Sequence, residues 1–366
     1  MTAFQPWRGR DDAGDSGDTR RWHHVVRALD ADATSGVALI GFACDEGVRR
    51  NGGRTGAAGG PAALRAALAN VPLDGEPALY DAGDVLCDDG ALEAAQARLG
   101  ERVAQVRRQG LLPLVLGGGH EMAWGTFQGL APSLVSGERL AGGQRPASRR
   151  SQVSGQRLTI VNLDAHFDLR EAPAGNSGTP FRQIHDWCVE HEVAFDYRVL
   201  GVSRYSNTRA LFDRAHRFGV RWWPDDTLQD LAGADAACAA LTADLARTDG
   251  RDDVDRADCV DGVYLTVCFD VLPGEKAPGV SAPAALGVPL ACVERIVDAV
   301  MRSGRVVAAD IAELNPAFDR DGLTARVAAR LAARIARAST RATASSRRSA
   351  RGPAVRRDSS HPSHST

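Results

Sequence analysis

The residues best suited to carry chemistry lie in the segment LTIVNLDAHFDLR, where an apolar run, residues 158–163, is followed by three possible metal ligands. Asp164, His166 and Asp168 are spaced two residues apart, so an extended backbone would place their side chains on one face. Carboxylates gathered this closely repel each other unless a cation compensates for their charge. The segment therefore favours a metal site, and the alternative is a set of loop-capping aspartates beside a core histidine.

Three other segments offer ligands of the same kinds at the ends of apolar runs. His120 follows the glycine run 117–119, Cys268 and Asp270 end another apolar run, and Glu313 lies in DIAELNP. Each of these segments alone is a weak signal. Together with the first segment they supply histidines and several carboxylates, which suit a pair of Mn²⁺-like ions that share bridging carboxylates. A structural zinc site would more often be a closed cluster of cysteines and histidines.

The elements that must position these residues follow an alternating pattern. Apolar runs typical of buried strands cover residues 37–44, 111–116, 158–163, 198–202, 263–270 and 305–311, and amphipathic patterns typical of helices cover 91–108, 290–302 and 322–337. Near-continuous apolar strands separated by helices predict an α/β fold, a doubly wound, mostly parallel sheet with helices on both faces. In such sheets ligands bind at the C-terminal ends of the strands, which is where the four motifs lie.

The chain is expected to form one large domain, residues 36–337, with polar additions. Residues 1–35 form an N-terminal extension, a Ser-, Gly- and Arg-rich insertion loop interrupts the domain at about 135–157, and a charged loop covers 247–261. Residues 338–366 are of low complexity and almost free of bulky apolar side chains, so a disordered basic tail is expected. The tail could bind polyanions, but a solvated extension without function is the simpler interpretation.

Composition excludes several classes of protein. A hydrophobic share of 44% and a net charge of -2 over 366 residues rule out a disordered chain. No apolar run approaches the roughly 18 residues of a membrane span, and the N-terminus lacks the apolar stretch of a signal peptide. The 7 cysteines include no CxxC pair, which is typical of a reducing compartment, and the acidic balance of the main domain argues against a nucleic-acid groove. We therefore expect a cytoplasmic globular protein whose partner is a small molecule, not a nucleic acid or a membrane.

Four motifs carry a specific resemblance to a known family. GGGHE, DAHFD, FDVLPGEKAPGVSAPA and DIAELNP occur in the order and spacing found in the ureohydrolase (arginase/agmatinase) family, over roughly residues 36–336. Within that family the chain is most similar to the formimidoylglutamases, through GFACDEGVRRNGGRTGAAGGPAALR, GGGHE and NSGTPFRQI. The resemblance implies an arginase-like three-layer sandwich, a ureohydrolase catalytic domain over residues 36–337 and a homo-oligomer, a trimer or hexamer.

The activity that the resemblance implies is the hydrolysis of N-formimidoyl-L-glutamate to L-glutamate and formamide, a step of histidine degradation. A pair of Mn²⁺ ions in each subunit would supply a hydroxide that attacks the amidinium carbon. Asp168 would relay a proton to the leaving amine, and Glu313 would pair with the amidinium group of the substrate. Hydrolysis of another amidine or guanidino compound, such as agmatine, is an alternative within the same class.

The metal ligands that the resemblance implies are His120, Asp164, His166, Asp168 and Asp270. The family's remaining ligand is an aspartate that bridges the two ions, and Cys268 stands in its place. A thiol is a softer and normally protonated donor. The cysteine could ligate a metal, leave only one ion tightly bound or impair the site, or it could be a buried strand residue with water completing the ligand shell. A metal-poor scaffold protein of the same fold is therefore a second alternative.

The two carboxylates of a glutamate substrate call for cationic partners. Arg182, in the segment NSGTPFRQI, is the first candidate because arginine binds carboxylates bidentately, and Arg50 and Arg54 come second. Ser177 occupies the loop in which arginases carry a substrate-contacting histidine, so we expect it to contact the substrate. The absence of that histidine makes arginine a poor candidate substrate.

Overall fold

The computed structural model describes residues 2, 4, 6–136, 157–246 and 262–350. Most of the predicted insertion loop, the charged loop at 247–261 and the end of the predicted tail, residues 351–366, lie outside these described residues. Within the described residues, no helix combines the length and the apolar character needed to cross a membrane.

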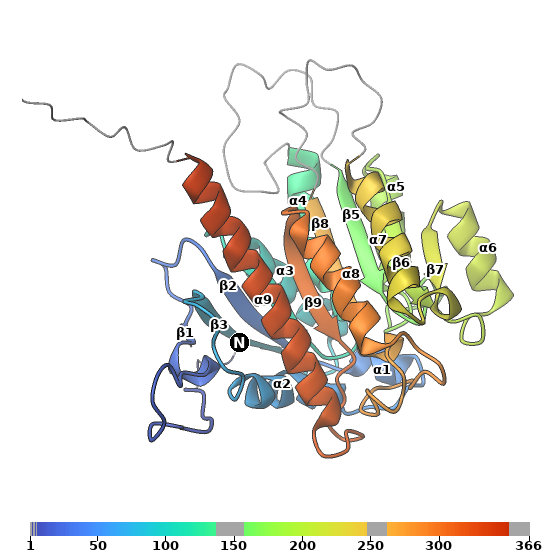
Figure 1. The fold of residues 1–366 in the computed structure, drawn as a ribbon. Coiled ribbons are helices and arrows are strands. Elements are labelled where there is room, and N and C mark those ends of the chain that lie inside the picture. The colour runs from blue at the N-terminus through green and yellow to red at the C-terminus, as the bar shows by residue number, and fades with distance from the viewer. Residues whose placement is uncertain (1, 3, 5, 137–156, 247–261, 351–366) are drawn as a thin grey trace, which may run out of the picture.

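The described part of the chain is organised around a parallel sheet (Figure 1). Its 9 strands lie in the order β1-β3-β2-β4-β9-β8-β5-β6-β7, and each pair of neighbours is parallel. The strands are β1 (Arg27–Ala28), β2 (Val37–Ala43), β3 (Leu79–Leu86), β4 (Leu112–Gly117), β5 (Leu158–Leu163), β6 (Asp196–Val202), β7 (Arg221–Pro224), β8 (Gly262–Cys268) and β9 (Val306–Ala312). The predicted doubly wound, parallel α/β architecture is therefore confirmed.

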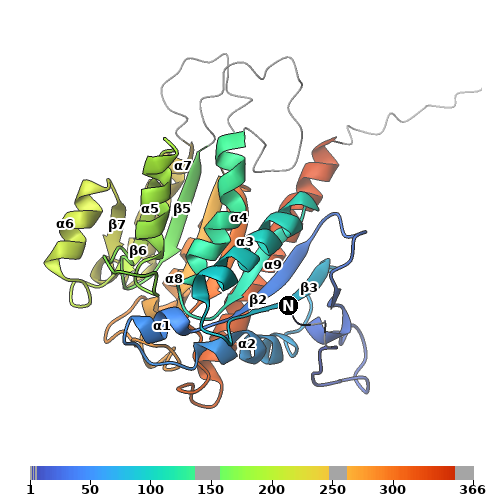
Figure 2. The same ribbon diagram turned by 180° about the vertical axis from the view of Figure 1, so that it is seen from behind.

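Helices cover both faces of the sheet, as the two opposite views show (Figures 1 and 2). One face carries α2 (Gly60–Leu68), α7 (Leu231–Ala246), α8 (Leu290–Arg302) and α9 (Leu323–Ala350), and the other carries α3 (Leu92–Arg108), α4 (Met122–Ser136), α5 (Pro180–Glu190) and α6 (Arg209–Arg217). A short helix, α1 (Glu46–Arg50), follows β2. Each layer buries its apolar side chains against the sheet, Ile296 and Ile335 on the first face and Leu99 and Phe127 on the second. The result is a three-layer sandwich with an apolar cluster on each side of the sheet.

The central strands are apolar along nearly their whole length because helices cover both of their faces. β5 reads LTIVNL and β8 reads GVYLTVC, and every residue of both strands is buried. This is the pattern expected of parallel strands in the middle of a sheet. Among their polar residues, Asn162 and Thr266 are fully buried and contribute to the site described below.

β3 was not predicted from the sequence because acidic residues interrupt its apolar pattern. It reads LYDAGDVL, and its Asp81 and Asp84 both pair with Arg65 of α2. Nε of Arg65 lies 2.9 Å from Oδ2 of Asp81, and the indole N–H of Trp7 donates to the same oxygen at 2.8 Å. Partners distant in sequence therefore neutralise these acids, which no local pattern reveals. The edge strands β1 and β7 were not predicted either, because runs of 2 and 4 residues are too short to show a recognisable hydrophobic pattern.

Replacing Arg65 with Met is expected to lower the free energy of unfolding by about 3–5 kcal/mol, because the variant leaves the buried Asp81 without its cationic partner. Chemical denaturation measures the change. Arg209→Met is the matched control: its ion pair with Asp213 is 3.8 Å long between side chains that are 93% and 65% exposed. Loss of that pair should cost less than about 1 kcal/mol. Equal losses in the two variants would contradict the role given to Arg65.

α9 continues beyond the end that the sequence predicted. The pattern indicated a helix over 322–337 followed by a disordered tail, but α9 runs to Ala350. Residues 338–350 contain no glycine or proline, and alanine and arginine, which recur there, are strong helix formers. The first breakers are Gly352 and Pro353, directly after the helix. The expectation of disorder is therefore corrected for residues 338–350.

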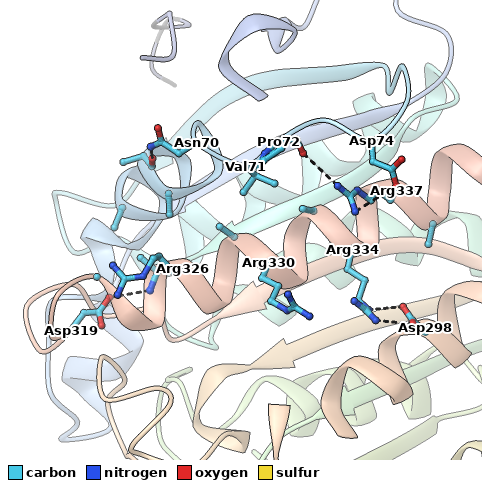
Figure 3. A pocket seen from close by; sticks show the side chains of 18 of the residues that line it. Asn70, Val71, Pro72, Asp74, Asp298, Asp319, Arg326, Arg330, Arg334 and Arg337 are labelled. Carbon is cyan, nitrogen blue, oxygen red and sulfur yellow. Dashed lines mark hydrogen bonds and ion pairs between the residues drawn. The ribbon is translucent and has the colours of Figure 1, made fainter. Parts of the chain in front are cut away.

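A groove of about 1300 Å³ lies along α9 and α2 (Figure 3). Its lining includes alanines of both helices, such as Ala66 and Ala329, and several arginines of α9. One of these, Arg334, ties α9 to α8 through Asp298, with Nε of Arg334 2.7 Å from Oδ1 of Asp298. None of the residues that line this groove is a predicted metal ligand, so the groove is separate from the site described next.

Candidate metal centre

The predicted metal ligands and Glu313 come from the ends of four strands that are neighbours in the sheet. β4, β9, β8 and β5 are consecutive in the strand order. His120 follows β4, Glu313 follows β9, Cys268 and Asp270 lie at the end of β8, and Asp164 follows β5. Because parallel strands end at the same edge of a sheet, the topology gathers residues as far apart as His120 and Glu313, which are 193 positions apart.

The first group of ligands contains His120, Asp164 and Cys268. Their ligand atoms all lie within 4.8 Å of one another, and all three side chains are buried. Nδ1 of His120 lies 3.0 Å from Oδ2 of Asp164 and 2.9 Å from Oδ2 of Asp168. Burial raises the pKa of the Cys268 thiol well above its usual value. This group offers a nitrogen, carboxylate oxygens and a sulfur to one position.

The ring of His120 is oriented toward this position. Its Nε2 lies 3.0 Å from Oγ1 of Thr266. Nδ1 is buried and has no hydrogen bond of acceptable angle, although two carboxylates are close to it. When Nε2 carries the ring proton and donates it to Thr266, Nδ1 therefore presents its lone pair to the ligand group.

The second group contains Asp164, His166 and Asp270, whose ligand atoms also lie within 4.8 Å of one another. Nδ1 of His166 is 3.0 Å from Oδ2 of Asp270 and 3.6 Å from Oδ1 of Asp164. The donors of this group are nitrogen and oxygen, the types that Mn²⁺ accepts. The side chain of His166 is 21% exposed, so the centre is open to solvent on this side.

Asp164 belongs to both groups, so it is the residue that two ions bound in these groups would share. Its Oδ2 accepts a hydrogen bond from the side-chain amide of Asn162 at 3.0 Å, and its Oδ1 accepts one from the backbone N–H of His166 at 2.7 Å. The amide of Asn162 also donates to the hydroxyl of Tyr197 at 2.9 Å. These contacts fix the orientation of the shared carboxylate before any ion arrives.

The carboxylates of the centre stabilise positive charge on the two histidines that lie between them. Burial lowers the pKa of His120, but the ion pairs with Asp164 and Asp168 outweigh it, and the pKa is raised well above its usual value. Burial also lowers the pKa of His166, but the charge of Asp270 outweighs this effect, and the pKa is raised well above its usual value. Burial raises the pKa of Asp164, but its close contacts with the two histidine rings hold it well below its usual value. A cation in this place would take over the charge that the histidine protons otherwise supply.

Asp168 differs from the other carboxylates in backbone and exposure. Its φ is 49°, a left-handed conformation that residues other than glycine seldom adopt. Burial, followed by the charge of Asp164, raises its pKa to about 6. Its side chain is 13% exposed, against 0% for Asp164 and 8% for Asp270. Among these three aspartates, Asp168 is the most accessible from outside.

Glu313 approaches the centre from β9 with one carboxylate oxygen left free. Its φ is 71°, and its Oε1 accepts a hydrogen bond from the backbone N–H of His120 at 2.9 Å. Its Oε2 is buried without a hydrogen-bond partner. Burial, followed by the charge of Glu121, raises the pKa of Glu313 to about 8. An unpaired buried carboxylate oxygen is costly, so this arrangement suits a residue that receives a cationic ligand.

The predicted substrate residues Ser177 and Arg182 lie in the loop and helix that follow DAHFD. On α5, Arg182 pairs with Asp186 at 2.8 Å and with Glu171 at 2.9 Å. The hydroxyl of Ser177 accepts a hydrogen bond from the amide of Asn51 at 3.1 Å. Within the described residues, no hydrogen bond or ion pair joins either side chain to a metal ligand.

Arg50 and Arg54 hold loops in place. Arg50 pairs with Glu46 at 3.0 Å. Arg54 donates to the carbonyl of Ser281 at 3.0 Å, and its guanidinium carbon lies 4.2 Å from the ring centroid of Phe318. Both guanidinium groups are therefore engaged by the protein itself.

A further arginine, Arg170, was not singled out from the sequence. It lies two residues after Asp168, its side chain is exposed, and among the described residues it has no ion pair or side-chain hydrogen bond. A Cβ atom at Gly178 would lie 2.6 Å from Cδ of Arg170 and 3.2 Å from Nδ2 of Asn51. The side chains of Arg170 and Asn51 thus lie side by side against the turn that contains Ser177.

Asn162 and Thr266 were also missed, and a signal for both was present. Each lies two positions before a ligand on the same strand, Asn162 before Asp164 and Thr266 before Cys268. Side chains two apart share a face of a strand, so polar residues at these positions in otherwise apolar runs indicate support for the ligands.

The donor set fits a pair of divalent cations. Two groups of ligands share one carboxylate, and the Nδ1 atom of His120 and Oε2 of Glu313 are buried without hydrogen-bond partners. Paired cations of this kind activate water and polarise a trigonal carbon. The arrangement can therefore support the hydrolysis of an amidine or guanidine.

Known proteins resemble this chain in sequence and in fold. The model of the Arginase family matches residues 35–337. The formimidoylglutamase of Cupriavidus pinatubonensis is 49% identical to this chain over 327 residues, which cover 88% of this chain and 95% of that protein. The formimidoylglutamase of Ralstonia nicotianae is also 49% identical, over 324 residues, which cover 88% of this chain and 91% of that protein. The solved structure of formimidoylglutamase from Bacillus subtilis has a TM-score of 0.70 at 21% identity and covers 90% of this chain and 96% of its own. A Mn²⁺-bound formiminoglutamase from Trypanosoma cruzi has a TM-score of 0.66 at 23% identity, with 86% and 96% covered. The chain therefore belongs to the arginase family.

Proposed function

We propose that this chain hydrolyses N-formimidoyl-L-glutamate to L-glutamate and formamide, a step of histidine degradation, at a pair of divalent cations. The observation that carries the proposal is the pair of ligand groups that share Asp164, with the free carboxylate oxygen of Glu313 beside them. Formimidoylglutamases at 49% identity support this choice of substrate.

The ligands of the first ion would be His120, Asp164, Asp168 and Cys268, and those of the second would be Asp164, His166 and Asp270. When bound, the pair of ions supplies an activated water molecule for attack on the substrate. Mn²⁺ suits the nitrogen and oxygen donors of the second group, and the Mn²⁺ in the Trypanosoma cruzi neighbour supports this ion. The thiol in the first group is a softer donor than Mn²⁺ prefers.

Two carboxylates of the chain would handle the substrate. Glu313 holds the amidinium cation through its free Oε2 and so fixes the trigonal carbon for attack. Water then adds to that carbon, the carbon–nitrogen bond to glutamate breaks, and the oxygen stays in formamide. Asp168, the most accessible aspartate of the centre, passes a proton to the departing nitrogen, which leaves as the amino group of glutamate.

The carboxylates of the substrate would be bound at the turn around Ser177. Arg170 supplies a guanidinium group that no described residue neutralises, Asn51 supplies an amide, and Ser177 supplies a hydroxyl. A guanidinium and neutral donors together form a carboxylate site. Arg182, by contrast, is already paired with Asp186 and Glu171.

Replacing Arg170 with Ala is expected to raise KM for N-formimidoyl-L-glutamate by about 10- to 100-fold with a smaller effect on kcat, because a charge-assisted contact is worth about 1.5–3 kcal/mol. Steady-state kinetics with N-formimidoyl-L-glutamine, which lacks the side-chain carboxylate, shows whether that carboxylate is the one bound.

Arg182→Ala is the matched control for Arg170→Ala. The sequence prediction assigns binding of the substrate carboxylate to Arg182. Because Arg182 is already paired with two acids, we expect its replacement to change KM by less than about 3-fold. A larger rise in KM for Arg182→Ala than for Arg170→Ala would transfer the role to Arg182.

Comparison of substrates tests the proposed function. The Mn²⁺-loaded protein is assayed with N-formimidoyl-L-glutamate, agmatine and L-arginine at equal concentrations. We expect turnover of the first compound at least about 100-fold above the others, since each missing or misplaced charge contact costs about 2 kcal/mol. Preferential turnover of agmatine would establish the agmatinase-like alternative instead, and no turnover by a folded protein that retains little metal would favour the metal-poor scaffold.

We also propose a cytoplasmic homo-oligomer, a trimer or hexamer, on the strength of the family resemblance. Light scattering of the purified protein is expected to give a mass of three or six times 38.8 kDa. A measured mass equal to that of a single chain at micromolar protein concentration would contradict this proposal.

A further inference from the structure

Cys268 is the feature in which this centre departs most from a site built for two Mn²⁺ ions. It is the last residue of β8 and is 1% exposed. Its Sγ lies within 4.8 Å of ligand atoms of His120 and Asp164, and it does not belong to the group of Asp164, His166 and Asp270. The two groups therefore differ in kind, one with a sulfur donor and one with nitrogen and oxygen only.

The position of Cys268 beside other ligand atoms distinguishes it from the other buried cysteines. Cys44 and Cys238 donate their S–H groups to Oε1 of Glu121 and to the carbonyl of Arg295, at 3.7 and 3.8 Å. Within the described residues Cys268, like Cys188 and Cys292, has no such acceptor, but of these three cysteines only Cys268 lies beside other possible metal ligands. Beside it, Nδ1 of His120, on a side chain that is 2% exposed, makes no hydrogen bond of acceptable angle. Two ligating atoms without hydrogen bonds thus face one buried position.

We propose that Cys268 is a thiolate ligand and makes the His120 position selective for a Zn²⁺-like ion, so that the centre holds ions of two different kinds. The inference rests on the proposed two-ion hydrolase and specifies its metal composition. One imidazole, two carboxylates and one thiolate can supply the four donors that Zn²⁺ prefers, whereas the all-nitrogen-and-oxygen group around His166 suits Mn²⁺. Asp164 alone would then link the two ions.

The chemistry of binding is a simple exchange. The S–H bond of Cys268 breaks heterolytically, the sulfur keeps the electron pair and binds the cation, and the proton leaves to solvent. No oxidant or reductant takes part. A thiolate in a buried cluster of carboxylates needs a cation as its counter-charge, so ligation and deprotonation are coupled.

Cobalt absorption tests ligation directly, because Co²⁺ replaces Zn²⁺ and a bond from thiolate to Co²⁺ gives an intense near-ultraviolet charge-transfer band. The full chain is stripped of metal, loaded with Co²⁺ and measured. We expect the band in the unaltered protein and in Cys238→Ser, the matched control with a distant buried thiol, and its loss in both Cys268→Ser and Cys268→Asp. A cobalt-loaded protein without the band, or a band that survives both Cys268 variants, would overturn the inference.

Metal competition tests selectivity independently of absorption. The stripped protein is equilibrated with one equivalent of Zn²⁺ per chain and a large excess of Mn²⁺, since N/O sites also bind Zn²⁺ more tightly than Mn²⁺, and the metal bound per chain is measured after removal of free ions. We expect one Zn²⁺-occupied and one Mn²⁺-occupied position in the unaltered protein. In Cys268→Asp the ratio of bound Zn²⁺ to Mn²⁺ should fall by about 10-fold, the usual effect of exchanging one ligand or its support. An unchanged ratio would overturn the inference.

These readouts separate the inference from the proposed function. A charge-transfer band without hydrolysis of N-formimidoyl-L-glutamate under any metal loading would uphold the thiolate ligand and refute the proposed function. Hydrolysis by a protein whose cobalt form lacks the band would support the proposed function and refute the thiolate ligand.

Discussion

Replacing Asp164 with Asn is expected to remove both metal ions and to reduce turnover by at least about 10⁴-fold, because Asp164 is the only residue common to the two ligand groups. The neutral amide keeps the size of the side chain but cannot balance two cations. Elemental analysis of metal per chain and turnover of N-formimidoyl-L-glutamate measure the two effects.

Two comparisons make the Asp164 result specific. His120→Asn removes a ligand of the first group only, so it should lower the metal content by about one ion per chain. Asp225→Asn is the matched control, because Asp225 is a buried aspartate, 5% exposed, that belongs to neither group. It should keep both ions and most of the activity. Retention of a full metal complement by Asp164→Asn would show that the centre is not bridged as described.

Replacing Glu313 with Gln is expected to lower kcat/KM by about 10²- to 10³-fold while the metal content stays unchanged. The amide oxygen can still accept the hydrogen bond from the backbone of His120, so the local fold should survive. What is lost is the negative charge at Oε2, the buried oxygen that has no partner within the protein. Steady-state kinetics and metal analysis on the same preparation separate the two effects.

Glu121→Gln is the matched control for Glu313→Gln. Glu121 is equally buried and lies beside His120. Its Oε1 accepts a hydrogen bond from the backbone N–H of Gly47 at 2.9 Å, a contact that an amide oxygen preserves, and its Oε2, like that of Glu313, is buried without a partner. We expect kcat/KM of this variant to stay within about 5-fold of the parent. A loss as large as that of Glu313→Gln would mean that burial of charge, not contact with the amidinium, explains both results.

The central fold and the grouping of the candidate ligands at strand ends were predictable because they depend on local periodicity. Fully apolar runs such as 158–163 predict buried parallel strands, and the spacing of Asp164, His166 and Asp168 predicts a shared face. That four such strands are neighbours, and that Asp164 is common to two ligand groups, required the strand order of the sheet. Strand order is a long-range property that no window of sequence contains.

Other features depended on partners distant in the chain and were missed or misplaced. β3 was hidden because Asp81 and Asp84 look unlike strand residues until Arg65 is placed beside them. The choice of Arg182 came from the sequence motif, which did not single out Arg170, whereas the structure shows that the guanidinium of Arg182 is already paired with acids. With arginine so abundant in this chain, residue type alone could not separate the two.

The most direct test of the account is product analysis with N-formimidoyl-L-glutamate before and after removal of metal. The account predicts L-glutamate and formamide in equal amounts, turnover abolished by a chelator, and recovery when Mn²⁺ is added back. Release of ammonia in place of formamide, or turnover that survives complete removal of metal, would contradict it.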